Sequence, residues 1–404
     1  MIASTRAHGF SARRGVGTLL ALASLLAAGC AAPAAPASKP AAPSGPAPAS
    51  AQAPAAPPAT APAAAAPAAP TTGAAASAAA PATVAREAPL NPPVTINMGV
   101  LRSGSEVGYY LALERGYFAE EGVNVELHDF TTAADEIAPL AAGQLDVGNG
   151  GINSGLFNAM SQGIPLKIVA DQAANAPGTR ATVWMVRSEL MDSGRFKTAA
   201  DMRGLTVGLG GSNTIIDVEL DEILKEGGLT RADVETKLVP YPDQVAAFAN
   251  GSIDVSYVFE PTQTRIKEQG TARVWKTAGD VIPNHESTVV IFGPSMYETD
   301  KLEAGKRFMA AYVRGVRDAR KEIIEGRSDA GFALMAKWTA VKDPDLWRKM
   351  ELQYTNPDCH NYSDSINRDL AWFVDNGVVK QPAGPVIDGS FCDYAIARLG
   401  RYQP

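Results

Sequence analysis

The sequence predicts an α/β protein built from two similar lobes, with helices towards the C-terminal end. Three observations predict this fold class. Short apolar strands alternate with amphipathic helices from Val94 onward, which is the pattern of a mainly parallel α/β sheet. The same order of elements returns about 108 residues later, and the chain after His285 is mainly helical. Residues 94–404 are enough for two domains with hydrophobic cores of their own.

Each half of the alternating region is predicted to run in the order strand, helix, strand, helix, strand. The first half comprises 94–100, 109–120, 123–130, 133–142 and 145–148, and the second comprises 205–209, 214–226, 236–239, 244–249 and 253–258. The clearest local match aligns Ala-Ala-Gly-Gln-Leu-Asp-Val at 141–147 with Ala-Asn-Gly-Ser-Ile-Asp-Val at 249–255. In both segments a glycine ends the helix, where it can adopt the left-handed conformation, and a strand follows at once.

The helices after the second half indicate how the lobes are divided. They are predicted at 301–325, 329–338, 343–353 and 363–376. Phe308, Tyr312 and Val316 recur at helical spacing, and we expect this face to pack onto the first lobe. The first lobe is therefore predicted to consist of 94–180 and 285–404, and the second lobe, 181–284, is inserted between them.

The N-terminus is predicted to be an export signal, residues 1–29. Three arginines precede an apolar run at 16–28, which is too short for a membrane-spanning helix of about 20 residues. The run ends in small residues before Cys30, as in a lipoprotein processing site, so Cys30 would become the lipidated first residue. The alternative is an ordinary signal peptide with an incidental cysteine. The mature protein is expected in the periplasm or on the outer face of the cytoplasmic membrane, anchored by the lipid on Cys30.

Composition limits the remaining possibilities. After Cys30 the chain up to residue 93 is dominated by Ala, Pro, Ser, Thr and Gly, which predicts a disordered tether because few side chains could form a core. The net charge of −7 argues against nucleic acid as a partner. Cys359 and Cys392 could pair in an oxidising compartment, or they could be two separate buried thiols.

Five segments carry a family resemblance: 109–123, 142–147, 200–207, 258–261 and 361–377. They resemble the NMT1/THI5-like receptors, which include sulfonate, taurine, nitrate and pyrimidine-precursor binding proteins. The resemblance implies a type II periplasmic binding protein of the Venus-flytrap kind. Such a protein would close on a small polar ligand, oxyanion-bearing or heteroaromatic, and deliver it to the permease and ATPase complex of an ABC importer in the inner membrane. We expect a monomer without a cofactor or a metal.

Candidate ligand-binding residues follow the strands, because open α/β sheets bind ligands beyond the carboxyl ends of strands. After the first strand come Arg102, Ser103, Ser105, Tyr109 and Tyr110. Hydroxyls and free N–H groups at a helix start suit an anionic or carbonyl oxygen, while tyrosines can cover a planar group. The structural alternative is that the serines cap the helix and Tyr110 belongs to the core.

A second candidate loop follows the third strand. It contains Asn149, Gly150, Asn153 and Ser154. The glycine would let a ligand approach the backbone closely, whereas Asn153 and Ser154 could equally cap the next helix.

The counterpart loop of the second lobe contains Gly211, Ser212, Asn213 and Thr214. Its hydroxyls and N–H groups could complete an oxygen-binding site from the opposite side. The lysine of a nucleotide-binding P-loop is missing, so this loop does not predict a nucleotide.

Three further residues have open interpretations. Glu260 could accept hydrogen bonds from an amine or pyrimidine donor, or it could pair with a scaffold arginine. His285, on the return segment, could bind the ligand, although a single histidine is more often structural. Trp184 is expected to pack in the core or at the hinge. We expect the second lobe to swing about crossing segments near 178–183 and 282–288.

Enzymatic chemistry is not indicated by the sequence. The four histidines have no metal-ligand spacing, and no Gly-x-Ser-x-Gly motif connects a strand to a helix. The cysteine-rich motif of the eukaryotic pyrimidine synthases that resemble this family is missing as well. Two rival functions nevertheless stay open, a receptor that feeds a sensor and an enzyme on the same scaffold.

Overall fold

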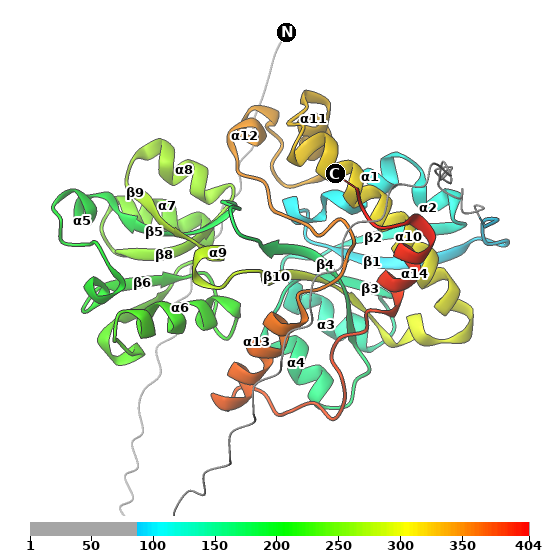
Figure 1. Cartoon of the computed structure of the whole chain (residues 1–404), viewed down its shortest axis with the longest axis horizontal. Coiled ribbons are helices and arrows are strands. Elements are labelled where there is room, and N and C mark those ends of the chain that lie inside the picture. The colour runs from blue at the N-terminus through cyan, green and yellow to red at the C-terminus, as the bar shows by residue number, and fades with distance from the viewer. Residues whose placement is uncertain (1–86, 404) are drawn as a thin grey trace, which may run out of the picture. The chain divides into compact units, whose positions relative to one another are not determined.

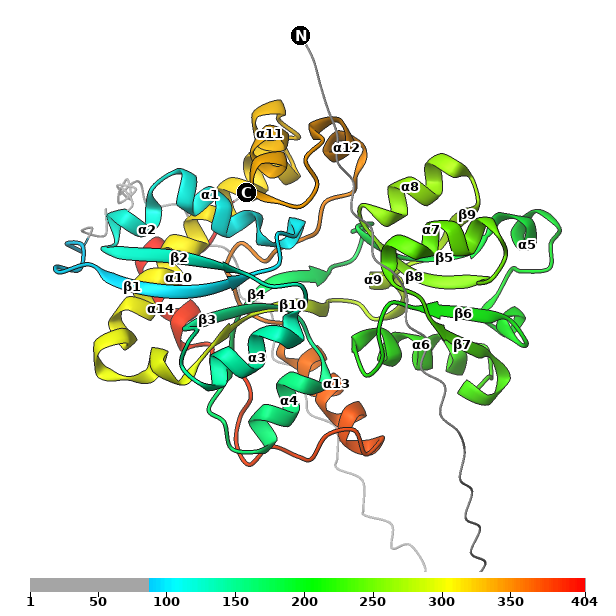
Figure 2. The same cartoon turned by 180° about the vertical axis from the view of Figure 1, so that it is seen from behind.

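The computed structural model of the chain describes residues 87–403 (Figure 1). The predicted signal peptide, the predicted lipidation site Cys30 and most of the predicted tether lie outside the described residues. Two five-stranded sheets organise the described chain, and we call them sheet 1 and sheet 2. Sheet 1 with its helices is the first half of the fold, and sheet 2 with its helices is the second half (Figure 2).

Sheet 1 has the strand order β2-β1-β3-β10-β4. Strands β1, β2 and β3 are parallel to one another, whereas β10 is antiparallel to both β3 and β4. The bounds are β1 Val94–Val100, β2 Val123–Asp129, β3 Val147–Gly151, β4 Lys167–Asn175 and β10 His285–Phe292.

Sheet 2 repeats this arrangement as β7-β6-β8-β5-β9. Strands β6, β7 and β8 are parallel, and β5 is antiparallel to β8 and β9. The bounds are β5 Thr182–Arg187, β6 Thr206–Leu209, β7 Glu235–Leu238, β8 Val255–Phe259 and β9 Ala272–Thr277. The predicted fold of two similar α/β halves is therefore confirmed.

An aspartate explains why the same segment recurs in both halves. The Asp146 carboxylate accepts the backbone N–H of Asn97 at 2.9 Å, and the Asp254 carboxylate accepts that of Thr206 at 3.0 Å. Each aspartate also donates its own N–H to the same partner's carbonyl at 2.8 Å. The glycine three residues earlier has a φ of 70° in the first half and 72° in the second. Each segment thus turns the chain and attaches the third strand of its half to the first.

Helices cover both faces of the two sheets. Those of the first half are α1 Val107–Glu114, α2 Tyr117–Glu120, α3 Ala133–Ala141 and α4 Ser154–Ser161. Those of the second half are α5 Ser188–Asp192, α6 Ile215–Glu226, α7 Tyr241–Ala249, α8 Thr262–Gln269 and α9 Ala278–Val281. The C-terminal helices are α10 Thr299–Ala319, α11 Asp329–Trp338, α12 Pro344–Lys349, α13 Ser363–Asp375 and α14 Ser390–Leu399. The remaining short turns are η1 Gly104–Glu106, η2 Ala199–Met202, η3 Arg231–Asp233, η4 Pro294–Tyr297 and η5 Arg320–Ile324.

Two sequence-based expectations were wrong in detail. The helix expected over 109–120 is divided into η1, α1 and α2, because Gly116 takes a φ of 69° between the last two. The chain after His285 begins with strand β10 rather than with helices. This strand pairs on both edges inside sheet 1, so it is a central buried strand whose β-branched residues suit that place.

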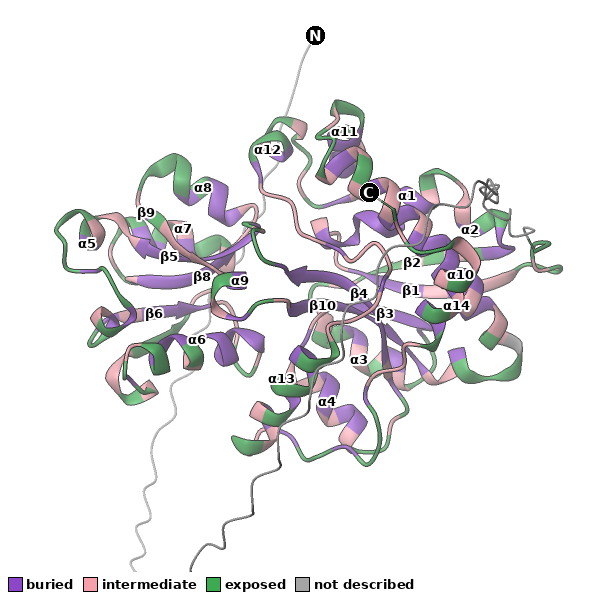
Figure 3. Cartoon of the chain, viewed as in Figure 1, coloured by how far each residue is buried: buried purple, intermediate pink, exposed green. Residues whose placement is uncertain are grey.

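The C-terminal helices pack back onto the first half, as predicted. Phe308, Tyr312 and Val316 of α10 are buried in one apolar cluster with residues of β1. Alternate residues of β10 serve the two faces of sheet 1: Val290 belongs to the cluster under α10, and Val289 to the cluster under α3, α4 and α13. Figure 3 shows that the inner strands of both sheets are largely buried, whereas the edge strands β2 and β7 are largely accessible to solvent.

Cys359 and Cys392 form a disulfide with a Cα–Cα distance of 5.9 Å. Cys392 lies on α14, and both cysteines are buried in the cluster that α10 shares with sheet 1. Of the two alternatives left open for these cysteines, the structure therefore shows pairing. The bond attaches the last helix to the chain segment that precedes α13.

Replacing both Cys359 and Cys392 by alanine is expected to lower the free energy of unfolding by about 2–4 kcal/mol, because the unfolded chain then gains the freedom of an open loop. Urea unfolding of the two forms measures the difference. Reducing the disulfide of the wild-type chain should give a similar loss, and an unchanged unfolding midpoint in both cases would contradict the prediction.

Candidate functional site

The loop after β1 is organised around a buried carboxylate, Glu106. This side chain accepts the backbone N–H of Leu101 at 2.7 Å, the N–H of Ser103 at 2.8 Å and the hydroxyl of Tyr110 at 2.5 Å. Burial raises the pKa of Glu106, although these hydrogen bonds oppose the shift. Glu106 was not among the predicted site residues. Glu106 fixes the conformation of the loop through these hydrogen bonds.

A network of uncharged polar side chains joins this loop to the end of β3. The hydroxyls of Ser103 and Ser105 lie 2.9 Å apart, and the amide nitrogen of Gln172 donates to both Ser105 Oγ and Asn149 Oδ1 at 3.1 Å. Asn149 in turn donates to the carbonyl of Gly99 at 2.6 Å. The predicted residues Ser103, Ser105 and Asn149 are therefore brought together, through a glutamine on β4.

Gln172 is the residue of this network that sequence reasoning missed. It lies inside strand β4, where the sequence carries no loop or cap signal, and its side chain is completely buried. Its amide oxygen has no hydrogen-bond partner among the described residues. A buried acceptor without a donor costs about 1–3 kcal/mol, so a donor placed there would be favourable.

The two tyrosines of the first loop do not form a ligand surface. Tyr109 is fully buried in the core, where its ring stacks on Tyr312 with 4.5 Å between the ring centroids. Tyr110 is also buried, bonded to Glu106 and stacked on Trp338 at 5.4 Å. Burial and the neighbouring Glu106 raise the pKa of Tyr110. The expectation that these rings cover a ligand is therefore corrected to core packing, because α10 and α11 pack over them.

Gly150 lies where β3 meets the next loop. Its φ is 121°, and a Cβ at this position would lie 2.6 Å from the Cβ of Ala133. The neighbouring N–H of Asn149 donates to Glu136 Oε2 at 2.7 Å. Burial raises the pKa of Glu136 to about 8, with the Asn149 hydrogen bond opposing the shift. Glu136 is thus a second buried carboxyl that holds the backbone of this loop by a hydrogen bond.

The predicted loops of the two halves meet directly. Asn153 forms an isolated antiparallel bridge with Thr214, and the N–H of Ser154 donates to the carbonyl of Asn213 at 3.1 Å. Asn153 caps α4 by accepting the N–H of Leu156 at 3.2 Å, and Thr214 caps α6. The cap interpretation is therefore confirmed for Asn153, and Thr214 is a cap as well. Both caps also lie in the contact between the halves.

The second half contributes an aromatic pair at its strand ends. Tyr241 begins α7 shortly after β7, and Phe259 ends β8; their ring centroids are 4.2 Å apart. Only a glycine fits beside them, because a Cβ at Gly210 would lie 2.1 Å from the Tyr241 ring. The predicted residues that follow, Gly211 and Ser212, are partly and fully exposed. Sequence reasoning missed Tyr241, and it included Phe259 in segment 258–261 without giving its ring a role.

Arg102 is placed beside an open cavity of about 500 Å³. Its guanidinium pairs with Asp129 at 2.5 Å and lies 5.9 Å from the centre of the Trp338 ring. Lys337 and Lys342 also line the cavity. The charge of Arg102 is therefore already compensated by Asp129.

Glu260 bridges the second half to the C-terminal segment. Its carboxylate accepts the N–H of Thr264 at 3.0 Å and the Thr264 hydroxyl at 2.9 Å. It also accepts the N–H of Glu351 at 3.1 Å. Its partners here are therefore a threonine and a backbone amide rather than an arginine.

His285 is not placed for ligand binding. Its Nδ1 lies 2.9 Å from Glu219 and its Nε2 lies 2.9 Å from Asp369, and all three side chains are fully buried. Both ring nitrogens are thus occupied by carboxylates. The expectation that His285 contacts the ligand is corrected to a role between the halves. Trp184, expected in the core or at the hinge, is buried and donates to the same Glu219 at 2.9 Å.

Within residues 87–403 no group of three or more His, Cys, Asp or Glu side chains is arranged to hold a metal ion. No helix in the same range is both long and apolar enough to cross a membrane.

The sheets and the site define the class of this protein. Two mixed five-stranded sheets of equal strand order, joined by two crossing connections, constitute the two-lobed fold of periplasmic binding proteins. A profile of the family described as NMT1/THI5 like matches residues 105–322, which is more than half of the chain. The chain belongs to the NMT1/THI5-like family. Comparison with curated protein sequences gave no match.

Solved structures with this fold include binding proteins and an enzyme. The nitrate-binding protein NrtA from Synechocystis PCC 6803 aligns with a TM-score of 0.61 at 15% identity, over 78% of this chain and 90% of its own. The aliphatic sulphonate binding protein SsuA from Escherichia coli aligns with a TM-score of 0.56 at 20% identity, over 72% and 95%. DszB, solved as a variant with biphenyl-2-sulfinic acid and described elsewhere as a desulfurization enzyme, aligns with a TM-score of 0.52 at 16% identity, over 76% and 99%.

Changing Glu136 to Gln is expected to remove a pH dependence of stability. The folded-state pKa of about 8 lies above the ordinary value of 4.5, so the folded protein holds this proton more tightly than the unfolded chain. Stability should consequently fall as the pH rises from 4.5 to 8. The glutamine keeps an acceptor for Asn149 but cannot ionise, so the variant should unfold at a higher urea concentration than wild type at pH 8.

Urea unfolding at pH 5, 6.5 and 8 measures this effect. Glu126→Gln, which changes an exposed carboxylate on β2, is the matched control and should retain the wild-type pH dependence. An equal pH dependence in Glu136→Gln and wild type would show that Glu136 is ionised throughout the range.

Proposed function

We propose that this chain is the solute-binding receptor of a bacterial ABC importer, and that it binds a small molecule between its two lobes. The observation that carries the proposal is the meeting of Asn153 and Ser154 with Asn213 and Thr214 at the strand ends of the two halves. Family membership and the folds of NrtA and SsuA support the same role. The role of receptor for a sensor rests on the same geometry.

The lobes are proposed to be 94–180 with 285–404, and 181–284. The two connections between sheet 1 and sheet 2 run from the end of β4 to β5 and from α9 to β10. The N–H of Asn284 donates to the carbonyl of Asn175 at 3.1 Å, so the two connections are tied together. Closure about this pair would bring loops of both lobes onto the ligand and exclude water.

The ligand is proposed to lie next to the predicted site residues other than Tyr109, Tyr110 and His285. These are Ser103, Ser105, Asn149, Gly150, Asn153 and Ser154 of the first lobe, Gly211, Ser212, Asn213, Thr214 and Glu260 of the second, and Arg102 at the edge. Helix starts with free N–H groups could also receive an oxyanion there.

We further propose an uncharged planar heteroaromatic ligand with at least one N–H donor. The unpartnered oxygen of Gln172 needs a donor, and the partly exposed Ser103 is linked to the Gln172 amide through Ser105. Tyr241 and Phe259 place a pair of rings at the strand ends of the other lobe, where a planar group could pack. Arg102, the cation among the proposed site residues, is paired with Asp129, which disfavours an oxyanion.

Attachment to a membrane and delivery to a permease and ATPase complex complete the proposal. Export as a lipoprotein through Cys30 would hold the receptor at the inner membrane, and the acidic chain would act as a monomer without nucleic acid. The disulfide between Cys359 and Cys392 agrees with an oxidising compartment.

The ligand class is tested by thermal unfolding of the full chain with pyrimidines, aromatic carboxylates, alkanesulfonates and nitrate. A pyrimidine present at about 100 times its dissociation constant should add about 2.7 kcal/mol to the stability. Stabilisation by sulfonates or nitrate alone would reject the heteroaromatic ligand and keep the receptor. Turnover of any bound compound would favour the enzyme that DszB exemplifies on this fold.

Gln172→Leu is expected to weaken binding of the stabilising ligand by about tenfold, because one ligand hydrogen bond is lost. Isothermal titration calorimetry measures the dissociation constant. The control is Gln162→Leu, which changes an exposed glutamine at the end of α4 and should leave the affinity unchanged. Equal affinity in both variants would remove Gln172 from the site.

A further inference from the structure

Three buried ionisable side chains from three elements meet at the connection between the halves. The ring of His285 on β10 lies between Glu219 of α6 and Asp369 of α13, with 2.9 Å to each carboxylate. Helix α6 belongs to the second half, whereas β10 and α13 belong to the first. One imidazole therefore links the two halves.

Glu219 is held by partners from both halves, since Trp184 lies on β5 and Asn175 lies on β4. Besides His285 it accepts the indole N–H of Trp184 at 2.9 Å and the amide of Asn175 at 3.3 Å. Asp369 is held less well, since its second oxygen is buried without a hydrogen-bond partner among the described residues. The link between the halves is therefore weakest at the carboxylate that α13 supplies.

Helix α13 reaches α6 through His285, and it also has a direct polar contact with α6. The indole N–H of Trp372 donates to Asp221 Oδ2 at 2.8 Å, and Arg231 pairs with the same aspartate. Trp372 lies three residues after Asp369, which places both on the same side of the helix.

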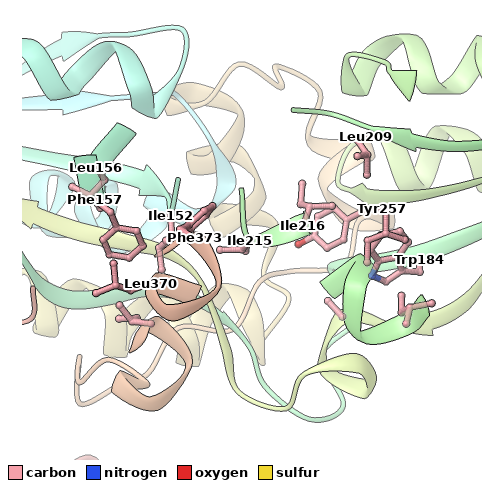
Figure 4. Close-up of a cluster of buried hydrophobic side chains, with 14 of the residues drawn as sticks. Ile152, Leu156, Phe157, Trp184, Leu209, Ile215, Ile216, Tyr257, Leu370 and Phe373 are labelled. Carbon is pink, nitrogen blue, oxygen red and sulfur yellow. The ribbon is translucent and has the colours of Figure 1, made fainter. Parts of the chain in front are cut away.

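Apolar contacts surround these polar ones. Leu370 and Phe373 of α13 belong to one buried cluster with Ile215 and Ile216 of α6 (Figure 4). In the figure Ile215 lies between Phe373 and Ile216, so the cluster continues from one half into the other. This face of α13 therefore packs against both halves, although the helix belongs to the first half.

We propose that α13 is a latch, which holds the second lobe against the first through the His285 network and the bond from Trp372 to Asp221. The ligand is not needed for this action, because none of these side chains lies in the proposed ligand site. The latch sets the balance between the arrangement described here and more open ones. Ligand affinity would then depend on a helix that does not touch the ligand.

Because the charges of the latch are buried, its strength should depend on every ionisable side chain in it. A buried imidazolium between two carboxylates is favourable only while all partners are present, because removal of one leaves a charge without compensation in a medium of low polarity. In an open arrangement, α6 would be separated from β10 and water would solvate Glu219 and His285. Without the Asp369 charge, the free energy of that open arrangement would be comparable to that of the closed one. Loss of the Asp369 charge should therefore shift the protein towards open arrangements.

The protonation of His285 supports the same conclusion. Burial alone would lower the pKa of His285, but the charge of Asp369 and the hydrogen bonds to Asp369 and Glu219 raise it to about 9. The other ionisable groups close to this network are Tyr257 of β8 and Tyr241 of α7 beside Glu219, and Arg368 of α13 beside Asp369. Because the folded-state pKa lies above the ordinary 6.5, the contribution is complete below pH 6.5 and is lost as the pH rises through 9.

The test measures the distance between the lobes in the ligand-free full chain. Nitroxide labels on non-natural residues at Gln144 and Lys225, both exposed, leave the cysteines unchanged, and pulsed electron spin resonance measures their separation. Asp369→Asn is expected to lengthen and broaden the distance distribution at pH 7. Wild type should show the same change when the pH is raised from 7 to 10, and the variant should show little further change.

Asp375→Asn is the matched control, because this carboxylate is exposed on the last turn of the same helix. It should reproduce the wild-type distances at both pH values. Trp372→Phe, which removes the bond to Asp221 and keeps an aromatic ring next to Phe373, should give a smaller lengthening. This variant serves if Asp369→Asn does not fold. Unchanged distances in every folded variant of Asp369 and Trp372 would overturn the latch, whatever ligand the receptor binds.

Discussion

The pairing of strand β10 is the constraint on which the rest of the structure depends. This strand lies between β3 and β4, so both of its edges must find partners, and all strands of sheet 2 precede it in the sequence. Strand β5 has the same position in sheet 2 and follows β4 directly. Sheet 1 is therefore complete only with a strand that follows the insertion, whereas all five strands of sheet 2 lie in one continuous segment. The two connections between the sheets are held side by side by the hydrogen bond from Asn284 to Asn175.

Burial on these crossing strands explains why ionisable groups gather there. His285 and its neighbour Glu286 point to different partners, His285 to Glu219 and Asp369, and Glu286 to Asp171 on β4 and the N–H of Tyr362. Burial raises the pKa of Asp171 to about 6, and it raises the pKa of Glu286 together with the charge of Asp171. Ionisation of either carboxyl therefore disfavours ionisation of the other across the adjacent strands.

The proposed site could be predicted from the sequence as far as its loops and caps. Asn153 and Thr214 are helix caps, a signal that depends on a few adjacent residues, and the structure has them capping α4 and α6. That these caps would touch each other could not be predicted, because it depends on how the halves dock. Gln172 was missed for a related reason: a glutamine within a strand has no sequence signal until the loop that it contacts is known.

Local patterns determined the alternation of strands and helices, the two similar halves, the glycine turns before Asp146 and Asp254, and the core face of α10. These depend on periodicity and turn chemistry within short stretches, so a single sequence carries them. The tertiary structure alone decided that β10 is a central strand and that Tyr109 and Tyr110 are core residues. It also decided that His285 lies between carboxylates 66 and 84 residues away. A buried charge or strand edge pairs with the partner that the folded chain brings near it. A local sequence pattern does not contain that information.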